Sequence, residues 1–198
     1  MKNILHIISS PRGEASYSTK LGRGIIEKIK AGEAVIVRTH DLTEKPFEHL
    51  AQYHLSAFFT RPHEHTVEQQ HDIQQSEQAI SELLSADIII ISVPVYNFNI
   101  HSTLKAWIDH IVRVGRTVRF NKNMVEGLVR GKKVYLAIAS KGVYSEGGMK
   151  QFDFVEPYLR HILGYLGMTD MQVLRVEGSS VPTEQQIALE STLKNFNP

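Results

Sequence analysis

Five short segments of the chain are rich in Ile and Val, and each predicts a β-strand. They are residues 3–8, 34–39, 87–93, 133–139 and 171–176. The runs that contain Ile4 and Ile88 do not alternate with polar residues, which is typical of parallel strands covered on both faces. The pattern therefore predicts a buried parallel sheet.

Helical segments separate these strands. Apolar residues recur at spacings of three and four, or a capping residue precedes the segment, in residues 18–30, 67–84, 100–114, 152–165 and 183–195. Strict alternation of strand and helix predicts an α/β fold with right-handed crossovers: a doubly wound five-stranded parallel sheet, order 2-1-3-4-5, with helices on both faces. One domain, residues 1–198, is expected for this length. In this topology ligands bind beyond the carboxyl ends of the strands, so the loops after the first, third and fourth strands should converge there.

The loop after the first predicted strand is rich in serine. It contains Ser10 and ends with Ser16-Tyr17-Ser18, where a helix is expected to begin. Hydroxyl groups and the free N–H groups of a helix start can surround a phosphate, helped by the helix dipole. The absence of a Walker A sequence and of G-x-G-x-x-G favours a monophosphate over a triphosphate or dinucleotide. The alternative is that the serines only cap the helix.

The loop after the third predicted strand mixes aromatic and amide side chains, in Val95-Tyr96-Asn97-Phe98-Asn99. Backbone groups and the Asn97 amide can hydrogen-bond the polar edge of a flat heterocycle, while Tyr96 or Phe98 covers its face. Asn99 is expected to cap the following helix instead.

The loop after the fourth predicted strand begins Ser140-Lys141-Gly142-Val143. Its N–H groups, with Lys141 nearby, can stabilise negative charge on such a ring. The alternatives are a solvated surface lysine and a glycine that simply permits a tight turn.

Residues 40–66 are long for a connection between elements. This segment contains Tyr53, Phe58 and Phe59, which predicts packing over a ligand or a second subunit rather than a solvated linker. It also contains five histidines, but no H-E-x-x-H or other recognisable ligand spacing, so no metal site is expected.

Composition narrows the function further. The chain has no cysteine, which excludes disulfides, iron–sulfur clusters, thiolate zinc sites and a cysteine nucleophile. A formal net charge of +1 favours neither nucleic acid nor an anionic membrane as partner. The lack of cysteine also predicts a cytoplasmic location, and the first apolar run is too short for a signal peptide or a membrane span. The basic stretch from Arg113 to Lys133, which includes Lys122, is expected to be mostly solvated surface; the alternative is that it attracts acidic substrates or pyridine-nucleotide phosphates.

The stretch Val95-Tyr96-Asn97-Phe98-Asn99-Ile100, with Glu126-Gly127-Leu128-Val129 and Gly131-Lys132-Lys133, resembles the FMN-dependent NADH-azoreductases, which also act as NADH:quinone oxidoreductases. The resemblance extends over nearly the whole chain, as far as Gly167-Met168-Thr169-Asp170. It implies a flavodoxin-like fold, bound FMN, NADH as co-substrate, and quinones and aromatic azo compounds as substrates. No catalytic side chain is implied, because the hydride chemistry takes place at the flavin.

The resemblance also implies particular site residues. The FMN phosphate would be held by Ser10, Ser16, Tyr17 and Ser18, and the isoalloxazine by Val95, Tyr96, Asn97, Phe98, Ser140, Lys141, Gly142 and Val143. A homodimer is implied in which both chains build each pocket, and its predicted lining residues are Phe98, Phe120, Tyr53, Phe58 and Phe59. Two departures stand out, because the family often has Met at Val95 and glycine at Val143, where a side chain is predicted to shift the loop.

The expected mechanism is ping-pong: NADH passes hydride to flavin N5 and leaves, and a quinone or azo dye then takes its place. Two alternatives have the same fold. A flavodoxin-type electron carrier would lack a substrate pocket and tends to be strongly acidic, whereas this chain is nearly neutral. A non-catalytic module would bind FMN or another nucleotide without turnover.

Overall fold

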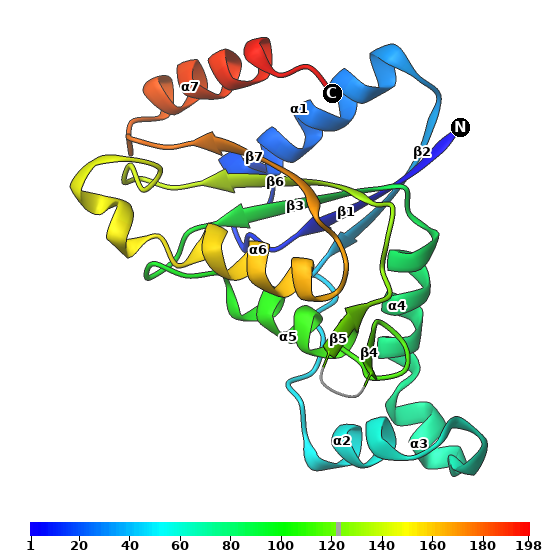
Figure 1. Cartoon of the computed structure of the whole chain (residues 1–198). Helices are drawn as coiled ribbons and strands as arrows, with labels where there is room; N and C mark the ends of the chain where they lie inside the picture. Colours follow the sequence, from blue (N-terminus) through cyan, green and yellow to red (C-terminus); the bar gives the residue numbers. More distant parts are fainter. Residues whose placement is uncertain (122–123) are drawn as a thin grey trace.

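Five parallel strands form the centre of the molecule (Figure 1). The computed structural model describes residues 1–121 and 124–198. The strands are β1 (Lys2–Ile8), β2 (Val35–Asp41), β3 (Ile88–Pro94), β6 (Lys133–Ala139) and β7 (Asp170–Val176). Their order is β2-β1-β3-β6-β7, so the five predicted strands and their predicted order are confirmed.

Helices cover the sheet on both faces (Figure 1). α1 (Tyr17–Gly32) and α7 (Pro182–Asn195) lie on one face, and α4 (Gln74–Ser85), α5 (Ser102–Ile111) and α6 (Val155–Tyr165) lie on the other. Every residue of β3 is buried, as the unbroken apolar run predicts for a central strand.

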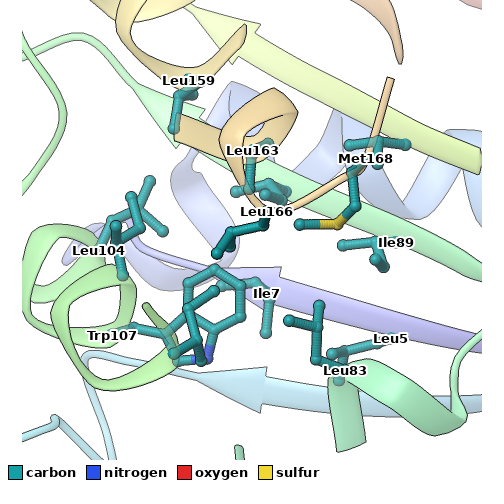
Figure 2. Packing of buried hydrophobic residues seen from close by; sticks show 14 of the residues in the cluster. Leu5, Ile7, Leu83, Ile89, Leu104, Trp107, Leu159, Leu163, Leu166 and Met168 are labelled. Atoms are coloured by element: carbon teal, nitrogen blue, oxygen red, sulfur yellow. The ribbon is translucent and has the colours of Figure 1, made fainter. Parts of the chain in front are cut away.

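Each face of the sheet has its own apolar core. On the α4–α5–α6 face, Figure 2 shows Trp107 packed among side chains from the helices and strands, including Ile7 and Leu166. On the α1–α7 face, Ile25 and Ile29 of α1 pack with Ile90 of β3. Burial of such side chains is the main term that stabilises the fold, at about 1.5–3 kcal/mol for each large apolar residue. The two cores hold the strand ends, and so the loops, in a fixed arrangement.

Several elements differ from the prediction. The single helix expected over 67–84 is divided into α3 (Val67–Asp72) and α4, because Ile73 has φ −95° and ψ 0° and joins two helix segments. Residues 40–66 contain α2 (Gln52–Phe59) and the short η2 (Pro62–Glu64), and a two-stranded antiparallel sheet is formed by β4 (Val118–Asn121) and β5 (Met124–Gly127). These elements are too short for periodicity to identify them.

The loops after β1, β3 and β6 meet at one edge of the sheet, as predicted. The backbone N–H of Ser9 donates to the Ser92 carbonyl over 3.3 Å, and that of Val95 donates to the Ala139 carbonyl over 2.9 Å. Among the described residues, no helix has the length and apolar character needed to cross a membrane.

Candidate functional site

The serine loop, residues 9–18, brings three buried hydroxyls to the start of α1: those of Ser10, Ser16 and Ser18. The hydroxyls of Ser16 and Ser18 lie 2.9 Å apart. Ser16 is the N-cap residue, yet within the described chain its side chain makes no capping hydrogen bond. The first N–H groups of α1 are therefore not satisfied by a serine cap, and the alternative that Ser16 is only a cap is not supported.

A further buried hydroxyl in this region was not identified from the sequence. Thr19, in the first turn of α1, is 1% exposed, and its Oγ1 has no hydrogen-bond partner among the residues that the structure describes. A buried hydroxyl without a partner is unfavourable by about 1–3 kcal/mol. The uncapped N–H groups of this helix start fit an anion that accepts several hydrogen bonds.

The serine loop is fastened to the middle of the sheet. Ser9 Oγ donates to the Ser92 carbonyl over 2.9 Å, and the Ser92 hydroxyl lies 2.8 Å from His6 Nε2. A Cβ on Gly22 of α1 would lie 2.6 Å from His6 Nε2, so glycine is what lets the helix approach this pair. Burial, with a smaller contribution from Arg23, lowers the pKa of His6 from 6.5 to about 4, and the imidazole is neutral near pH 7.

The loop after β3 forms a tight turn with two backbone hydrogen bonds. Tyr96 N–H donates to the Asn99 carbonyl over 3.0 Å, and Asn99 N–H donates to the Tyr96 carbonyl over 2.9 Å. The two central residues, Asn97 and Phe98, have φ of 48° and 66°. Asn tolerates this region, whereas a bulky residue such as Phe adopts it at a cost of about 1–3 kcal/mol. The turn therefore holds an aromatic side chain, 44% exposed, in a strained position at the sheet edge.

Asn99 does not cap the next helix, so this prediction was wrong. Its Oδ1 accepts a hydrogen bond from Ile100 N–H over 2.8 Å, within the turn. The N-cap of α5 is His101, whose side chain accepts from Thr103 N–H. The sequence placed the helix start two residues early because histidine is not a preferred N-cap residue.

The loop after β6 faces the turn after β3. Ser140 Oγ donates to the Gly142 carbonyl over 2.8 Å, and a Cβ on Gly142 would lie 3.0 Å from the Tyr144 ring. Two rings lie near the Phe98 ring. The Tyr144 ring is 6.1 Å from it, and the Phe152 ring is 5.6 Å from it. Phe152 is the last residue of η3 (Gly147–Phe152). We call Phe98, Tyr144 and Phe152 the aromatic rim. The sequence reasoning missed Tyr144 and Phe152, which only the folded loop brings to Phe98.

Val143 does not adopt a backbone conformation that requires glycine. Among the described non-glycine residues, only Asn97 and Phe98 have positive φ. The Val143 side chain instead approaches Gly178, where an added Cβ would lie 3.2 Å from Val143 Cγ2. Backbone contacts from this loop are thus compatible with valine.

The other predicted lining residues lie away from the aromatic rim within one chain. The helix α2, which carries Tyr53, Phe58 and Phe59, extends beyond the C-terminal end of α5 and is well separated from the loops at the sheet edge (Figure 1). The Phe58 ring packs 4.1 Å from the Arg113 guanidinium, and Phe59 is 80% exposed. Phe120 is exposed on β4. Of the five predicted lining residues, only Phe98 lies where the loops after β3 and β6 meet.

Much of the predicted basic stretch is occupied in ion pairs. Arg113 is only 5% exposed and lies 3.1 Å from Glu77, so the expectation of a solvated side chain was wrong for this residue. Arg119 and Arg130 both pair with Glu126 on β5. Lys122 lies outside the described residues. Since Arg116 also pairs with Glu77, each of the two glutamates is shared by two arginines, and the pairing neutralises part of the positive charge of this stretch.

Known proteins resemble this chain over almost its whole length. Residues 2–197 match the family model for the flavodoxin-like fold. Two relatives named FMN-dependent NADH:quinone oxidoreductase are each 44% identical: that of Mesorhizobium japonicum covers 89% of this chain and 84% of its own, and that of Herminiimonas arsenicoxydans covers 93% and 91%. The chain belongs to this flavodoxin-like family.

Solved structures with the same fold include two azoreductases. The FMN-dependent NADH-azoreductase of Bacillus anthracis str. Ames Ancestor, solved in complex with FMN, is 25% identical, with a TM-score of 0.85 over 97% of this chain and 96% of its own. The azoreductase of Bacillus anthracis str. Sterne, 24% identical, has a TM-score of 0.88 over 98% and 96%. The serine loop and the turn after β3 thus belong to a fold that this chain shares with these structures over almost its whole length.

Proposed function

We propose that this chain is an FMN-dependent oxidoreductase that uses NADH to reduce quinones and to cleave aromatic azo bonds. The observation on which the proposal rests is that one sheet edge combines an uncapped helix start, lined by buried hydroxyls, with a strained turn that presents an aromatic ring. An anion site next to an aromatic surface suits a flat ring with a phosphate tail. The names of the relatives give the reaction class.

The phosphate is assigned to the serine loop. Ser10, Ser16 and Ser18 donate hydroxyl hydrogen bonds, and the N–H groups of Tyr17 and its successors point along the α1 dipole. The buried Tyr17 side chain donates to the Pro182 carbonyl over 2.8 Å, so its hydroxyl fixes the helix start rather than binding the phosphate.

The flavin ring is assigned to the space between the loop after β3 and the loop after β6. Val95, Tyr96 and Asn97 offer backbone groups and an amide from one side, and Ser140 to Val143 offer backbone N–H groups from the other. When bound, FMN supplies the two-electron chemistry that passes hydride from NADH to the acceptor. The aromatic rim receives donor and acceptor in turn, which makes the kinetics ping-pong, and no side chain acts as a nucleophile.

We also propose that residues 1–198 act as one domain in a cytoplasmic homodimer. Several apolar side chains of the α2 region are exposed: Tyr53, Leu55, Phe59 and Val67. Such residues next to one another are typical of an interface between subunits. A second chain would cover them and could bring Tyr53, Phe58, Phe59 or Phe120 to the aromatic rim, which they do not reach within their own chain.

Spectroscopy and turnover test the proposal. The purified protein should have the absorption of a bound flavin, should release FMN on denaturation, and should be bleached by NADH without oxygen. It should then oxidise NADH rapidly with menadione or methyl red. A flavodoxin-type carrier would bind FMN without such turnover, and a colourless protein that ignores added FMN would refute the assignment. Mass measurement on dilution tests the dimer.

A further inference from the structure

Arg175, near the end of β7, lies among three carboxylates behind the aromatic rim. Its guanidinium contacts Asp153, lies 2.6 Å from Glu156 Oε2 and lies 3.4 Å from Glu177 Oε2. The Arg175 side chain is 11% exposed, and the side chains of Asp153 and Glu177 are buried to a similar degree. Ion pairs shielded from water in this way are strongly destabilised when one partner is removed.

Two of these carboxylates also hold the loop after β6. Glu177 accepts hydrogen bonds from the backbone N–H of Tyr144 over 3.1 Å and of Ser145 over 3.3 Å, and from the Ser145 hydroxyl. At the other end of the segment, Asp153 Oδ1 accepts from Val155 N–H over 3.0 Å and caps α6. Arg175 thus fastens both ends of residues 144–153.

This segment carries two of the three rings of the aromatic rim. The backbone N–H of Tyr144 is one of the donors to Glu177, and Phe152 immediately precedes Asp153 in the chain. Both rings meet Phe98 from this segment. The guanidinium of Arg175 is therefore linked, through Glu177 and Asp153, to the segment that carries both rings.

We propose that Arg175 is a positioning residue for the flavin ring: by neutralising the three carboxylates it keeps residues 144–153 closed against the turn after β3, and so sets the affinity for FMN. This inference rests on the proposed function. Without the guanidinium, three partly buried carboxylates repel one another, and the segment that they hold moves away from Phe98.

Arg160 offers a matched control. Its Nε lies 2.7 Å from Glu156 Oε1, so it binds one of the same carboxylates, yet its side chain is 43% exposed. Within the described residues its only ion pair is with Glu156, and it holds no part of residues 144–153. Loss of Arg160 therefore reports on Glu156 alone.

The test compares Arg175→Met, Arg175→Lys and Arg160→Met with the unchanged protein. FMN affinity is measured by quenching of flavin fluorescence, and hydrogen exchange of the Tyr144 and Ser145 amides is measured in the protein without FMN. We expect Arg175→Met to weaken FMN binding at least about tenfold and to speed exchange at both amides by a similar factor. Arg175→Lys should lie between, because one ammonium cannot reproduce the planar fork. Arg160→Met should stay within about twofold.

A folded Arg175→Met variant with unchanged exchange and unchanged FMN affinity overturns the inference. If that variant does not fold, Glu177→Ala removes the acceptor of the two loop amides and must weaken FMN binding similarly, or the inference fails. If the unchanged protein binds no FMN, the proposed function is refuted, while the exchange rates still decide whether Arg175 closes the segment.

Discussion

The serine loop and the aromatic rim lie at the same sheet edge but are held in different ways. The serine loop is joined to the adjacent strand β3 by uncharged hydrogen bonds, from the Ser9 N–H and hydroxyl to the Ser92 carbonyl. The aromatic rim depends instead on the buried charges of Arg175 and Glu177, which hold residues 144–153. The phosphate end is therefore preformed, whereas the ring end depends on buried charge and can be loosened independently.

The strongest test of this division places a negative charge in the serine loop. Ser16→Glu puts a carboxylate where the phosphate should bind, so FMN affinity should fall about 100-fold or more through repulsion. Riboflavin, which lacks the phosphate, should lose much less affinity. Folding should survive, because an acidic residue at a helix start favours the helix dipole. Both affinities are measured by fluorescence titration.

Ser191→Glu provides the control for added charge. Ser191 is exposed on α7, so the same substitution there should leave both affinities unchanged. If Ser16→Glu weakened riboflavin as much as FMN, the serine loop would not be a phosphate site, and the comparison between a phosphate end and a ring end would fail.

A smaller effect is expected from the histidine that anchors the phosphate end. Because burial lowers the pKa of His6 from 6.5 to about 4, the unfolded chain takes up a proton on His6 at a higher pH than the folded protein. Stability is therefore lost as pH falls from 6.5 towards 4, by about 2 kcal/mol between pH 7 and pH 5. His6→Gln should remove this part of the pH dependence, as measured by urea unfolding at both values.

The difference in pH dependence between the unchanged protein and His6→Gln isolates the contribution of His6 to stability. Burial also lowers the pKa of His110, but that residue titrates in both proteins and cancels. His161→Gln, at an exposed position of α6, should leave the pH dependence unchanged. Unfolding free energies that fall in parallel for the unchanged protein and His6→Gln would show that the serine loop does not rest on a neutral histidine.

How much the sequence reveals follows the same division. Strand order and the position of the serine loop were predictable, because buried strands and a Ser-rich helix start leave local patterns. His6 is evident in the sequence as a histidine within an apolar run, but no local sequence pattern shows that it contacts Ser92 of another strand. Tyr144 and Phe152 were missed for the same reason, since the contacts that bring them to Phe98 start from Arg175 in a later strand.

The smallest of these effects concerns Phe98, in the aromatic rim. Phe98→Asn relieves the cost of φ 66° but loses the ring contacts with Tyr144 and Phe152, each worth about 0.5–1.5 kcal/mol. The two terms nearly offset, so the free energy of unfolding should change by less than about 1 kcal/mol. The KM for a quinone should nevertheless rise about tenfold, because an aromatic stacking surface is lost.

Phe98→Tyr is the control for Phe98→Asn. It keeps both the aromatic surface and the positive φ, so its KM and stability should match those of the unchanged protein. If Phe98→Asn kept the original KM and became more stable, the strained turn would serve no purpose in binding. If instead only the KM rose, the chain accepts backbone strain at this one bulky residue because the ring must stand at the edge of the sheet, opposite the segment that Arg175 holds.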